Sequence, residues 1–281
     1  MLRHRLGESY MTAAEMVSKL NLPPQTLAAV NNIPLPDNYL ELKESFFHVT
    51  TLFKTYAAKD TNGLSVLRLY LDWIVDSKAQ YDTLGIPEIY FWDSMKDIAI
   101  WCDDYLTKYG VPGFKEWEWV GRSLRLEVIR IGRLQFEPIQ LSQNVTLSGQ
   151  TFAAGLSILD VHIPAGEPLT PEAALASMNR APEFYKTYFN KAFSLLHCHS
   201  WLLSPDLKEL LSEHSRIIQF QNLFTVYKTD NEERQAEERV FGFQSDDPHK
   251  YPESTSLQKA VKKYMLDGNE VMMGAGIRKA E

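Results

Sequence analysis

Hydrophobic residues in the first half of the chain recur at the spacing of α-helices. Between residues 37 and 56, five apolar positions advance by four and three residues, which places them on one helical face. Runs with the same spacing occupy residues 64–75 and 91–105, and the first of these is apolar on nearly every side. The pattern therefore predicts a helical bundle in which residues 64–75 are central. The five positions are Leu42, Phe46, Val49, Phe53 and Tyr56.

Capping and turn residues predict where these helices begin and end. Thr12 and Glu15 have the spacing of a capping box, and Asp37 suits the start of the longer helix. Gly110 suits a helix C-terminus just before Pro112. Helical periodicity stops at residues 111–120, so we expect a helical domain over residues 1–116 and a second domain over residues 117–281.

The second half of the chain has the pattern of strands alternating with a few helices. Residues 123–131 and 134–141 alternate between apolar and polar positions, which predicts two antiparallel strands joined at Gly132-Arg133. More continuous apolar runs predict buried strands, and three other segments have helical spacing, with Pro182 dividing the first. The further strands are expected at 155–163, 193–203, 216–227, 240–243 and 271–277, and the helices at 171–188, 204–211 and 256–266. This order predicts an α+β fold, a mixed and mostly antiparallel sheet flanked by helices.

Residues 159–173 predict a strand, a short turn and a capped helix. The strand ends at Ile163, Ala165-Gly166 form the turn, and Thr170 before Pro171 has the sequence of a helix start. Such a connection directs backbone N–H groups at whatever lies beyond the strand, often an anion. An ordinary capped connection without a ligand is the alternative interpretation.

Composition narrows the range of partners. The net charge of −7 argues against binding to nucleic acid or to an anionic membrane through charge, and no apolar run is long enough to span a bilayer. The first seven residues are basic but lack the apolar core of a signal peptide, and Cys102 and Cys198 do not form a disulfide framework. We therefore expect a soluble cytoplasmic protein. No pattern in the sequence indicates an oligomeric state.

Histidines and glutamates supply the candidate chemistry. His162 lies at the end of a predicted strand, where it is either a general base or a core histidine with a hydrogen-bonded partner. His197 and His199 share one face of another strand, so with His162 they could bind zinc or iron. Glu127 and Glu137, both on predicted strands, are alternative bases unless they simply face solvent.

Four segments of the chain resemble a bacterial family of two-domain acyltransferase-like proteins. The segments are residues 133–136 (RLQF), 161–166 with 169–172 (VHIPAG, LTPE), 198–203 (CHSWLL) and 216–221 (RIIQFQ). Members pair a helical N-terminal domain with a C-terminal domain similar to the GNAT (N-acetyltransferase) superfamily. The resemblance implies transfer of an acyl group from acyl-CoA, such as acetyl-CoA, to an amine, with a small-molecule acyl donor and acceptor as the partners.

The resemblance also implies roles for particular residues. Catalysis would fall to His162, Glu127 or His199, and acyl-CoA would lie near Ile163, Ala165, Gly166 and Thr170. The chain departs from the wider superfamily because no Gln/Arg-x-x-Gly-x-Gly/Ala loop follows a candidate strand, and because two glutamates flank the expected pyrophosphate position. These are Glu167 and Glu172.

Two other classes of function fit the same residues. One is a metal- or small-ligand-binding protein centred on His162, His197 and His199. The other is a catalytically inactive acyltransferase-like module whose helical half binds a protein partner.

Overall fold

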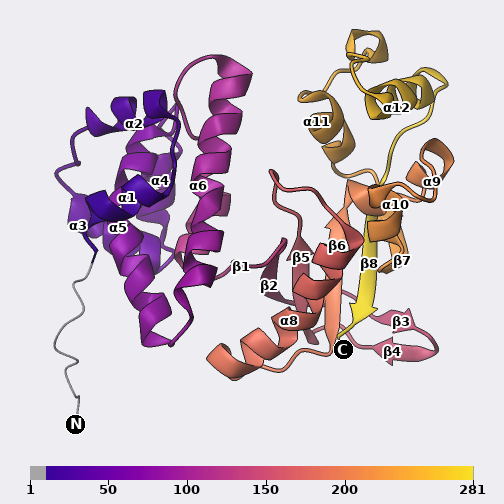
Figure 1. The fold of residues 1–281 in the computed structure, drawn as a ribbon, viewed down its shortest axis with the longest axis horizontal. Helices are drawn as coiled ribbons and strands as arrows, with labels where there is room; N and C mark the ends of the chain where they lie inside the picture. The colour runs from indigo at the N-terminus through magenta and orange to yellow at the C-terminus, as the bar shows by residue number, and fades with distance from the viewer. Residues whose placement is uncertain (1–10, 281) are drawn as a thin grey trace. The chain divides into compact units, whose positions relative to one another are not determined.

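The computed structural model describes residues 11–280 and divides the chain into two compact units, residues 1–129 and 130–281. The expected boundary near residue 116 lies before the last helix of the first unit. The basic segment at residues 1–7 lies outside the described residues. Figure 1 shows helices in the first unit and a sheet with flanking helices in the second.

The first unit is helical throughout its described part, as predicted. Thr12 accepts a hydrogen bond from the backbone N–H of Glu15 and completes a capping box at the first helix, and Gly110 ends α6 in the left-handed conformation. The helices are α1 (Ala13–Lys19), α2 (Pro24–Asn31), α3 (Tyr39–Phe47), α4 (Thr51–Ala57), α5 (Leu64–Thr83), α6 (Glu88–Tyr109) and α7 (Trp117–Leu124).

Helix α5 is the centre of this unit, which confirms the interpretation of its all-round apolar pattern. Tyr70 and Trp73 are fully buried on it, and α1, α2, α6 and α7 all contact it. The prediction of one long helix over residues 37–56 was wrong, because the chain breaks between α3 and α4. The hydroxyl oxygen of Ser45 accepts hydrogen bonds from the Thr50 side chain and the Phe53 backbone, which ends one helix and starts the next.

The predicted strand over residues 123–131 was also wrong for most of its length. Residues up to Leu124 belong to α7, whose Val120 and Leu124 are buried four residues apart on one helical face. Tyr70 and Ser77 of α5 donate hydrogen bonds to backbone carbonyls of α7, so packing on α5 decides the local structure. Strand pairing begins only at Ile129.

The second unit contains a six-stranded mixed sheet in the order β1-β2-β5-β6-β8-β7. Strands β5 and β6 are parallel, whereas β2–β5, β6–β8 and β7–β8 are antiparallel, which confirms the predicted fold class. The strands are β1 (Ile129–Ile131), β2 (Leu134–Gln140), β5 (Ser157–His162), β6 (Leu195–Ser200), β7 (Thr225–Asp230) and β8 (Met273–Lys279), with a separate hairpin of β3 (Val145–Leu147) and β4 (Gln150–Phe152).

Helices connect the strands, and α8 (Pro171–Phe189) packs on one face of the sheet. On that face Cys198 is fully buried, and the Tyr185 hydroxyl of α8 donates a hydrogen bond to the Phe136 carbonyl of β2. Helix α10 packs against α8. The helices are α8 (Pro171–Phe189), α9 (Leu207–Leu210), α10 (Arg216–Gln221), α11 (Gln235–Phe241) and α12 (Ser256–Leu266), with 3-10 turns η1 (Trp201–Leu203) and η2 (Pro248–Lys250).

Several predicted elements of this unit differ in the structure. The strand expected over residues 216–227 divides into α10 and β7, because Ser215 caps α10 with its side chain. The strand expected at 240–243 begins within α11, and the β3–β4 hairpin was not predicted from the sequence. Pro182 does not divide α8, because buried residues on both sides of it pack on the sheet and outweigh its cost of about 3 kcal/mol.

The opposite face of the sheet changes character along its strands. At one end, Ile158, Leu195 and Ile277 join the β3–β4 hairpin in a hydrophobic cluster. Two residues further along β5 and β6, the same face carries Asp160 and His197. This apolar-to-polar change marks where the candidate site begins.

Candidate active site

The site lies where the parallel strands β5 and β6 stop pairing. Their pairing covers Leu159↔Leu196 and Asp160↔His197, while β5 continues to His162 and β6 to Ser200. The carboxyl ends of parallel strands are where open sheets commonly receive ligands. The chain leaves β5 at this end and enters the loop to α8.

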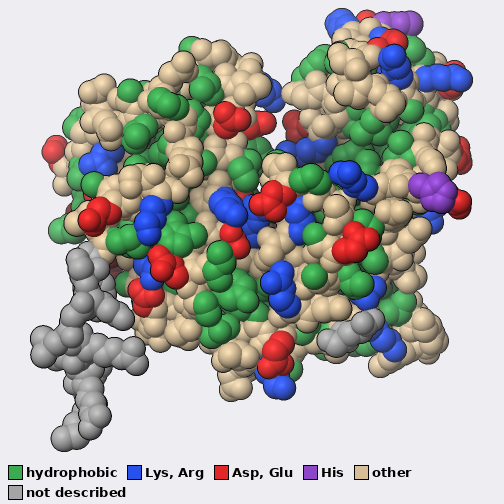
Figure 2. Space-filling model, viewed as in Figure 1, with side chains coloured by type: hydrophobic (Ala, Val, Ile, Leu, Met, Phe, Trp, Pro, Cys, Tyr) green, Lys and Arg blue, Asp and Glu red, His purple; other side chains and the backbone are tan. Residues whose placement is uncertain are grey.

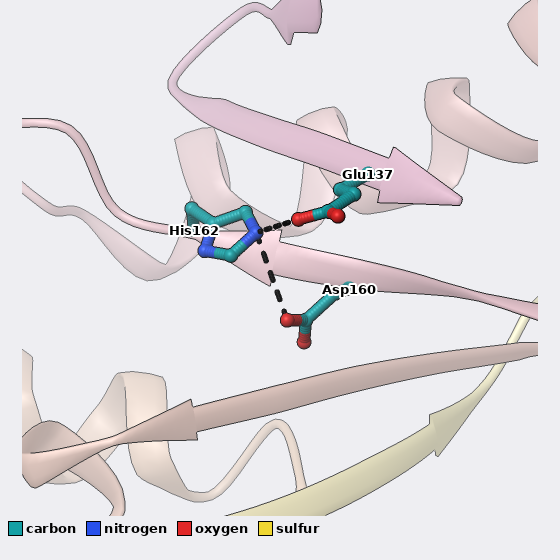
Figure 3. Close-up of side chains that lie close together, drawn as sticks. All are labelled: Glu137, Asp160 and His162. Carbon is teal, nitrogen blue, oxygen red and sulfur yellow. Dashed lines mark hydrogen bonds and ion pairs between the residues drawn. The ribbon is translucent and has the colours of Figure 1, made fainter. Parts of the chain in front are cut away.

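Three polar side chains converge on this end of the sheet from β2 and β5. The register pairs Glu137 with Asp160 and Gln135 with His162, so strand alternation brings Glu137, Asp160 and His162 to one face. Nε2 of His162 lies 3.1 Å from a Glu137 carboxylate oxygen and 3.6 Å from an Asp160 carboxylate oxygen (Figure 3). All three side chains are partly buried, with 16% of each carboxylate side chain and 26% of His162 exposed.

A second histidine extends the cluster across the sheet. His197 Nδ1 lies 2.7 Å from the other oxygen of Asp160, and its Nε2 lies 3.2 Å from the Tyr227 hydroxyl. Burial raises the pKa of Tyr227, and the Asp160 charge adds to this effect, so the phenol stays protonated at neutral pH. Asp160 is therefore held between two imidazoles, one on each oxygen.

The structure assembles a different set from the three histidines considered from the sequence. His199 shares the face of His197, but its Nε2 lies 3.2 Å from Asp230, which also pairs with Lys228. Among the described residues, Glu137, Asp160 and His162 form the group of ligand-type atoms that lie within 4.8 Å of one another.

Glu127 lies in the first unit and not on a strand. It occupies the turn between α7 and β1, where Arg125 donates two hydrogen bonds to its carboxylate at 2.7 and 3.0 Å. Arg122 lies 3.6 Å from the same carboxylate. The glutamate on the sheet is Glu137, the one that strand alternation on β2 directs toward His162.

The loop from β5 to α8 is held in place by two buried arginines that sequence reasoning missed. Arg133 donates hydrogen bonds to the carbonyls of Pro164 at 2.8 Å and Pro168 at 3.2 Å, and Arg130 lies 3.6 Å from Glu167. Burial lowers the pKa of Arg133, and the nearby Arg130 charge adds to this effect. The sequence feature that could have indicated their role is the presence of two arginines in a predicted hairpin that is otherwise apolar.

The loop residues chosen from the sequence lie at this helix start. Ala165 and Gly166 are exposed, Gly166 has a positive φ of 101°, and Ile163 is half-buried at the end of β5. Thr170 caps α8 by accepting a hydrogen bond from the backbone N–H of Ala173 at 3.2 Å, as predicted. The arrangement presents loop amides and a capped helix N-terminus beside the open end of β5.

Neither cysteine contributes a nucleophile. Burial raises the pKa of Cys198 well above its ordinary value, and it raises the pKa of Cys102 to about 12. A thiol must lose its proton to attack a substrate, so both behave as buried apolar side chains. The candidate catalytic groups on the sheet face that carries Asp160 and His197 are therefore imidazoles and carboxylates.

The first unit contains a cavity of its own. Its volume is about 490 Å³, within the usual range for small-molecule pockets. Aromatic rings form part of its wall, and charged side chains of both signs line it as well. Its lining includes Phe46, Phe53, Tyr70, Trp117, Lys54, Arg122, Glu116 and Glu118.

The molecular surface has no single dominant sign of charge on the face that Figure 2 shows, where acidic and basic side chains are interspersed. Within residues 11–280, no helix combines the length and the apolar character that crossing a bilayer would require.

A mixed sheet whose parallel pair opens beside a capped helix defines a GNAT-like fold. Comparison of the sequence with known domain families supports this fold. The GNAT-like C-terminal domain family matches residues 128–278, and the N-acyltransferase N-terminal domain family matches residues 11–126. The chain therefore belongs to the family of acyltransferase-like proteins that combine these two domains. The comparison with curated proteins found no match.

Solved structures share the fold over nearly the whole chain. An acyltransferase in complex with decanoyl-CoA and teicoplanin superposes with a TM-score of 0.76 at 22% identity, covering 98% of this chain and 91% of that one. A mutant acyltransferase in complex with octanoyl-CoA also has a TM-score of 0.76 at 22% identity, with coverages of 99% and 91%. An acyltransferase in complex with decanoyl-CoA has the same score at 23% identity, with coverages of 96% and 88%.

Proposed function

We propose that this protein is an acyl-CoA-dependent N-acyltransferase that transfers an acyl group from the CoA thioester to a primary amine. One observation carries the proposal: His162, flanked by two carboxylates, lies at the opening of β5 and β6, directly before the loop to capped helix α8. A base and an anion-binding loop then lie at one end of the sheet. Transfer from a thioester to an amine needs both.

The donor pyrophosphate is assigned to residues 163–170. The carbonyls of Pro164 and Pro168 accept from Arg133, which fixes the loop conformation. The N-terminus of α8 favours negative charge, and the ion pair of Glu167 with Arg130 offsets the repulsion that this glutamate would otherwise exert. These features replace the glycine-rich loop that the chain lacks.

His162 is assigned as the general base. Its Nε2 faces both carboxylates, so the neutral ring keeps its proton there and carries the accepting lone pair on Nδ1, which Figure 3 shows on the side of the ring away from both carboxylates. As the amine nitrogen bonds to the thioester carbon, Nδ1 takes the amine proton. The C–S bond then breaks, and the His162 imidazolium gives this proton to the departing sulfur, so that CoA leaves as the thiol and the imidazole is neutral again.

The carboxylates have a second role in this scheme. At neutral pH an aliphatic amine arrives as an ammonium ion, which Glu137 and Asp160 attract toward His162, and it loses one proton to solvent before its nitrogen attacks the thioester. The same negative charge stabilises the imidazolium that forms during transfer. His197 acts as a positioning residue, because it holds the second oxygen of Asp160.

The cavity in the first unit, considered by itself, is a further candidate site for a small ligand. Its aromatic wall suits an apolar or aromatic body, and its charges of both signs suit an amine-bearing ligand.

Solved acyltransferases of this fold are complexed with decanoyl-CoA, octanoyl-CoA and teicoplanin. These ligands support an acyl-CoA donor and a small-molecule acceptor for this protein. An acyl-CoA substrate and two reduced thiols suit the cytoplasm, and the sequence resemblance suggests a bacterial source.

The proposal is tested by mass spectrometry of reaction mixtures. The protein is incubated with acyl-CoAs from acetyl to decanoyl and with a panel of primary amines, and acylated amine and free CoA thiol are both quantified. Acyl-amine and CoA should form in equal amounts, and only when both substrates are present. Thioester loss that is independent of every amine would contradict a transferase, and the absence of any thioester loss would contradict acyl-CoA as donor.

A further inference from the structure

Two of the three separations among the polar atoms of Glu137, Asp160 and His162 are close to those of ligands on a zinc ion. Tetrahedral Zn²⁺ with bonds of about 2.0–2.1 Å separates neighbouring ligand atoms by about 3.3 Å. The distances from His162 Nε2 to Glu137 and Asp160 are 3.1 and 3.6 Å, which bracket this value. Each of the three residues offers one ligand atom, and these atoms all lie within 4.8 Å of one another.

The charge of the group also suits a divalent cation. Glu137 and Asp160 contribute two negative charges and neutral His162 contributes none, so a bound Zn²⁺ would be balanced. One imidazole nitrogen and two carboxylate oxygens are ligands that zinc accepts, whereas magnesium and calcium favour oxygen alone. The side chains are partly buried, which strengthens the attraction without closing off a fourth, solvent position.

The surroundings already hold one ligand in place. His197 Nδ1 contacts the Asp160 oxygen that does not face His162, and Tyr227 contacts the far side of His197. Outer partners of this kind fix the orientation of a metal-binding carboxylate and raise affinity. Because β2 and β5 set the positions of all three residues by their pairing, little rearrangement is needed on binding.

We propose that Glu137, Asp160 and His162 bind one Zn²⁺, and that this ion switches off the transfer base. Zinc takes the Nε2 lone pair of His162, so the ring proton moves to Nδ1, the nitrogen that would otherwise accept the amine proton. Zinc binding and general-base catalysis are therefore mutually exclusive. The second half of this inference rests on the proposed function; the metal site itself does not.

Calorimetric titration of ZnCl₂ into metal-free full-length protein tests the site. One equivalent should bind, and Co²⁺ in its place should give visible d–d absorption of a low-coordinate ion. Glu137→Gln and Asp160→Asn should each weaken zinc binding at least tenfold, because each removes a charged ligand while keeping the side-chain shape. Asp230→Asn is the matched control on the same sheet and should bind zinc like the unchanged protein.

The possible results test the zinc site and the proposed acyltransferase function independently. No zinc binding, or equal affinity in Glu137→Gln, Asp160→Asn and the unchanged protein, would overturn the site. If acyl transfer is observed, zinc should inhibit it and EDTA should restore it; full activity with zinc bound at this site would overturn the switch. If no acyl transfer is found, the proposed function fails while calorimetry still decides the metal site.

Discussion

At the scale of single residues, the chemistry of His162 depends on the strand register that places it. His162 pairs with Gln135 and Asp160 pairs with Glu137, so a slip of one residue between β2 and β5 would move the histidine to the opposite face. Leu159 and Val161 are buried on the opposite face of β5, so such a slip would exchange them with the polar residues and is costly. The core therefore maintains the geometry of the polar cluster.

Replacing His162 should separate transfer from donor binding. We expect His162→Gln to lower kcat about 10²–10⁴-fold, the usual contribution of a general base, while the Kd of acyl-CoA changes less than twofold. Steady-state thiol release and calorimetry measure the two quantities. His214→Gln, at an exposed position, serves as the control. A fall in kcat of less than threefold would remove His162 from the role of base.

The two cysteines should be unreactive in the folded protein. Cys198 is fully buried with its pKa raised well above the ordinary value, and Cys102 is buried with a pKa of about 12. At pH 8 we expect fewer than about one in ten molecules to react with a thiol reagent in an hour, against complete reaction of both thiols in denaturant. Rapid modification of either cysteine at pH 8 would contradict this burial.

The sequence indicated part of the site for reasons that the structure explains. His162 and the loop before Thr170 could be found because they follow directly from a strand end and a helix cap. The contact of His162 with Glu137 could not, because Glu137 is 25 residues away and reaches it only through pairing of β2 with β5. Arg130 and Arg133 were missed because burial of an arginine depends on carbonyls and carboxylates supplied by a distant loop.

At the scale of elements, the connection from β5 to α8 joins the sheet to the anion-binding loop. Thr170→Ala should cost about 1 kcal/mol of unfolding free energy, because it leaves the Ala173 N–H without its cap. We also expect weaker acyl-CoA binding, about three- to tenfold in Kd. Chemical denaturation and calorimetry provide the two measurements.

A matched cap elsewhere controls for stability. Thr255 caps α12 in the same way, so Thr255→Ala should cost a similar amount of stability and leave acyl-CoA affinity unchanged. Equal losses of acyl-CoA affinity in the two variants would show that the effect of Thr170→Ala is only one of stability.

The accuracy of the predicted elements depended on how local their determinants are. Helices α8 and α12 and strands β2 and β5 lie close to where the pattern predicted them, because caps and periodicity agree there. Residues 216–221 and 240–241 were mistaken for strands, since short apolar runs fit a buried helix equally well. Residues 117–124 became helical through packing on α5, which no local pattern reports.

At the scale of the whole molecule, the two buried thiols predict that the folded protein loses stability at alkaline pH. Burial raises the pKa of Cys102 to about 12 and that of Cys198 well above its ordinary value, against about 8.5 in an unfolded chain. The folded state then holds protons that the unfolded state has released. Stability is therefore fully present below pH 8.5 and is lost as pH rises toward 12.

Denaturant titrations between pH 8 and 11 measure this effect. The free energy of unfolding should fall by at least about 1 kcal/mol per pH unit above pH 9. Cys102→Ala should reduce the slope with pH, whatever it does to stability itself. A free energy that is constant from pH 8 to 11 would contradict the burial of these thiols.

The central claim is that acyl-CoA binds at the opening of β5 and β6 and along the loop to α8. Hydrogen exchange of the full-length protein, measured with and without a non-reactive acyl-CoA thioether, tests this location most directly. Residues 163–173 and the end of β6 should gain protection, since their amides face the ligand or become less accessible on binding. Protection confined to other parts of the chain, or no change at saturating ligand, would contradict the account.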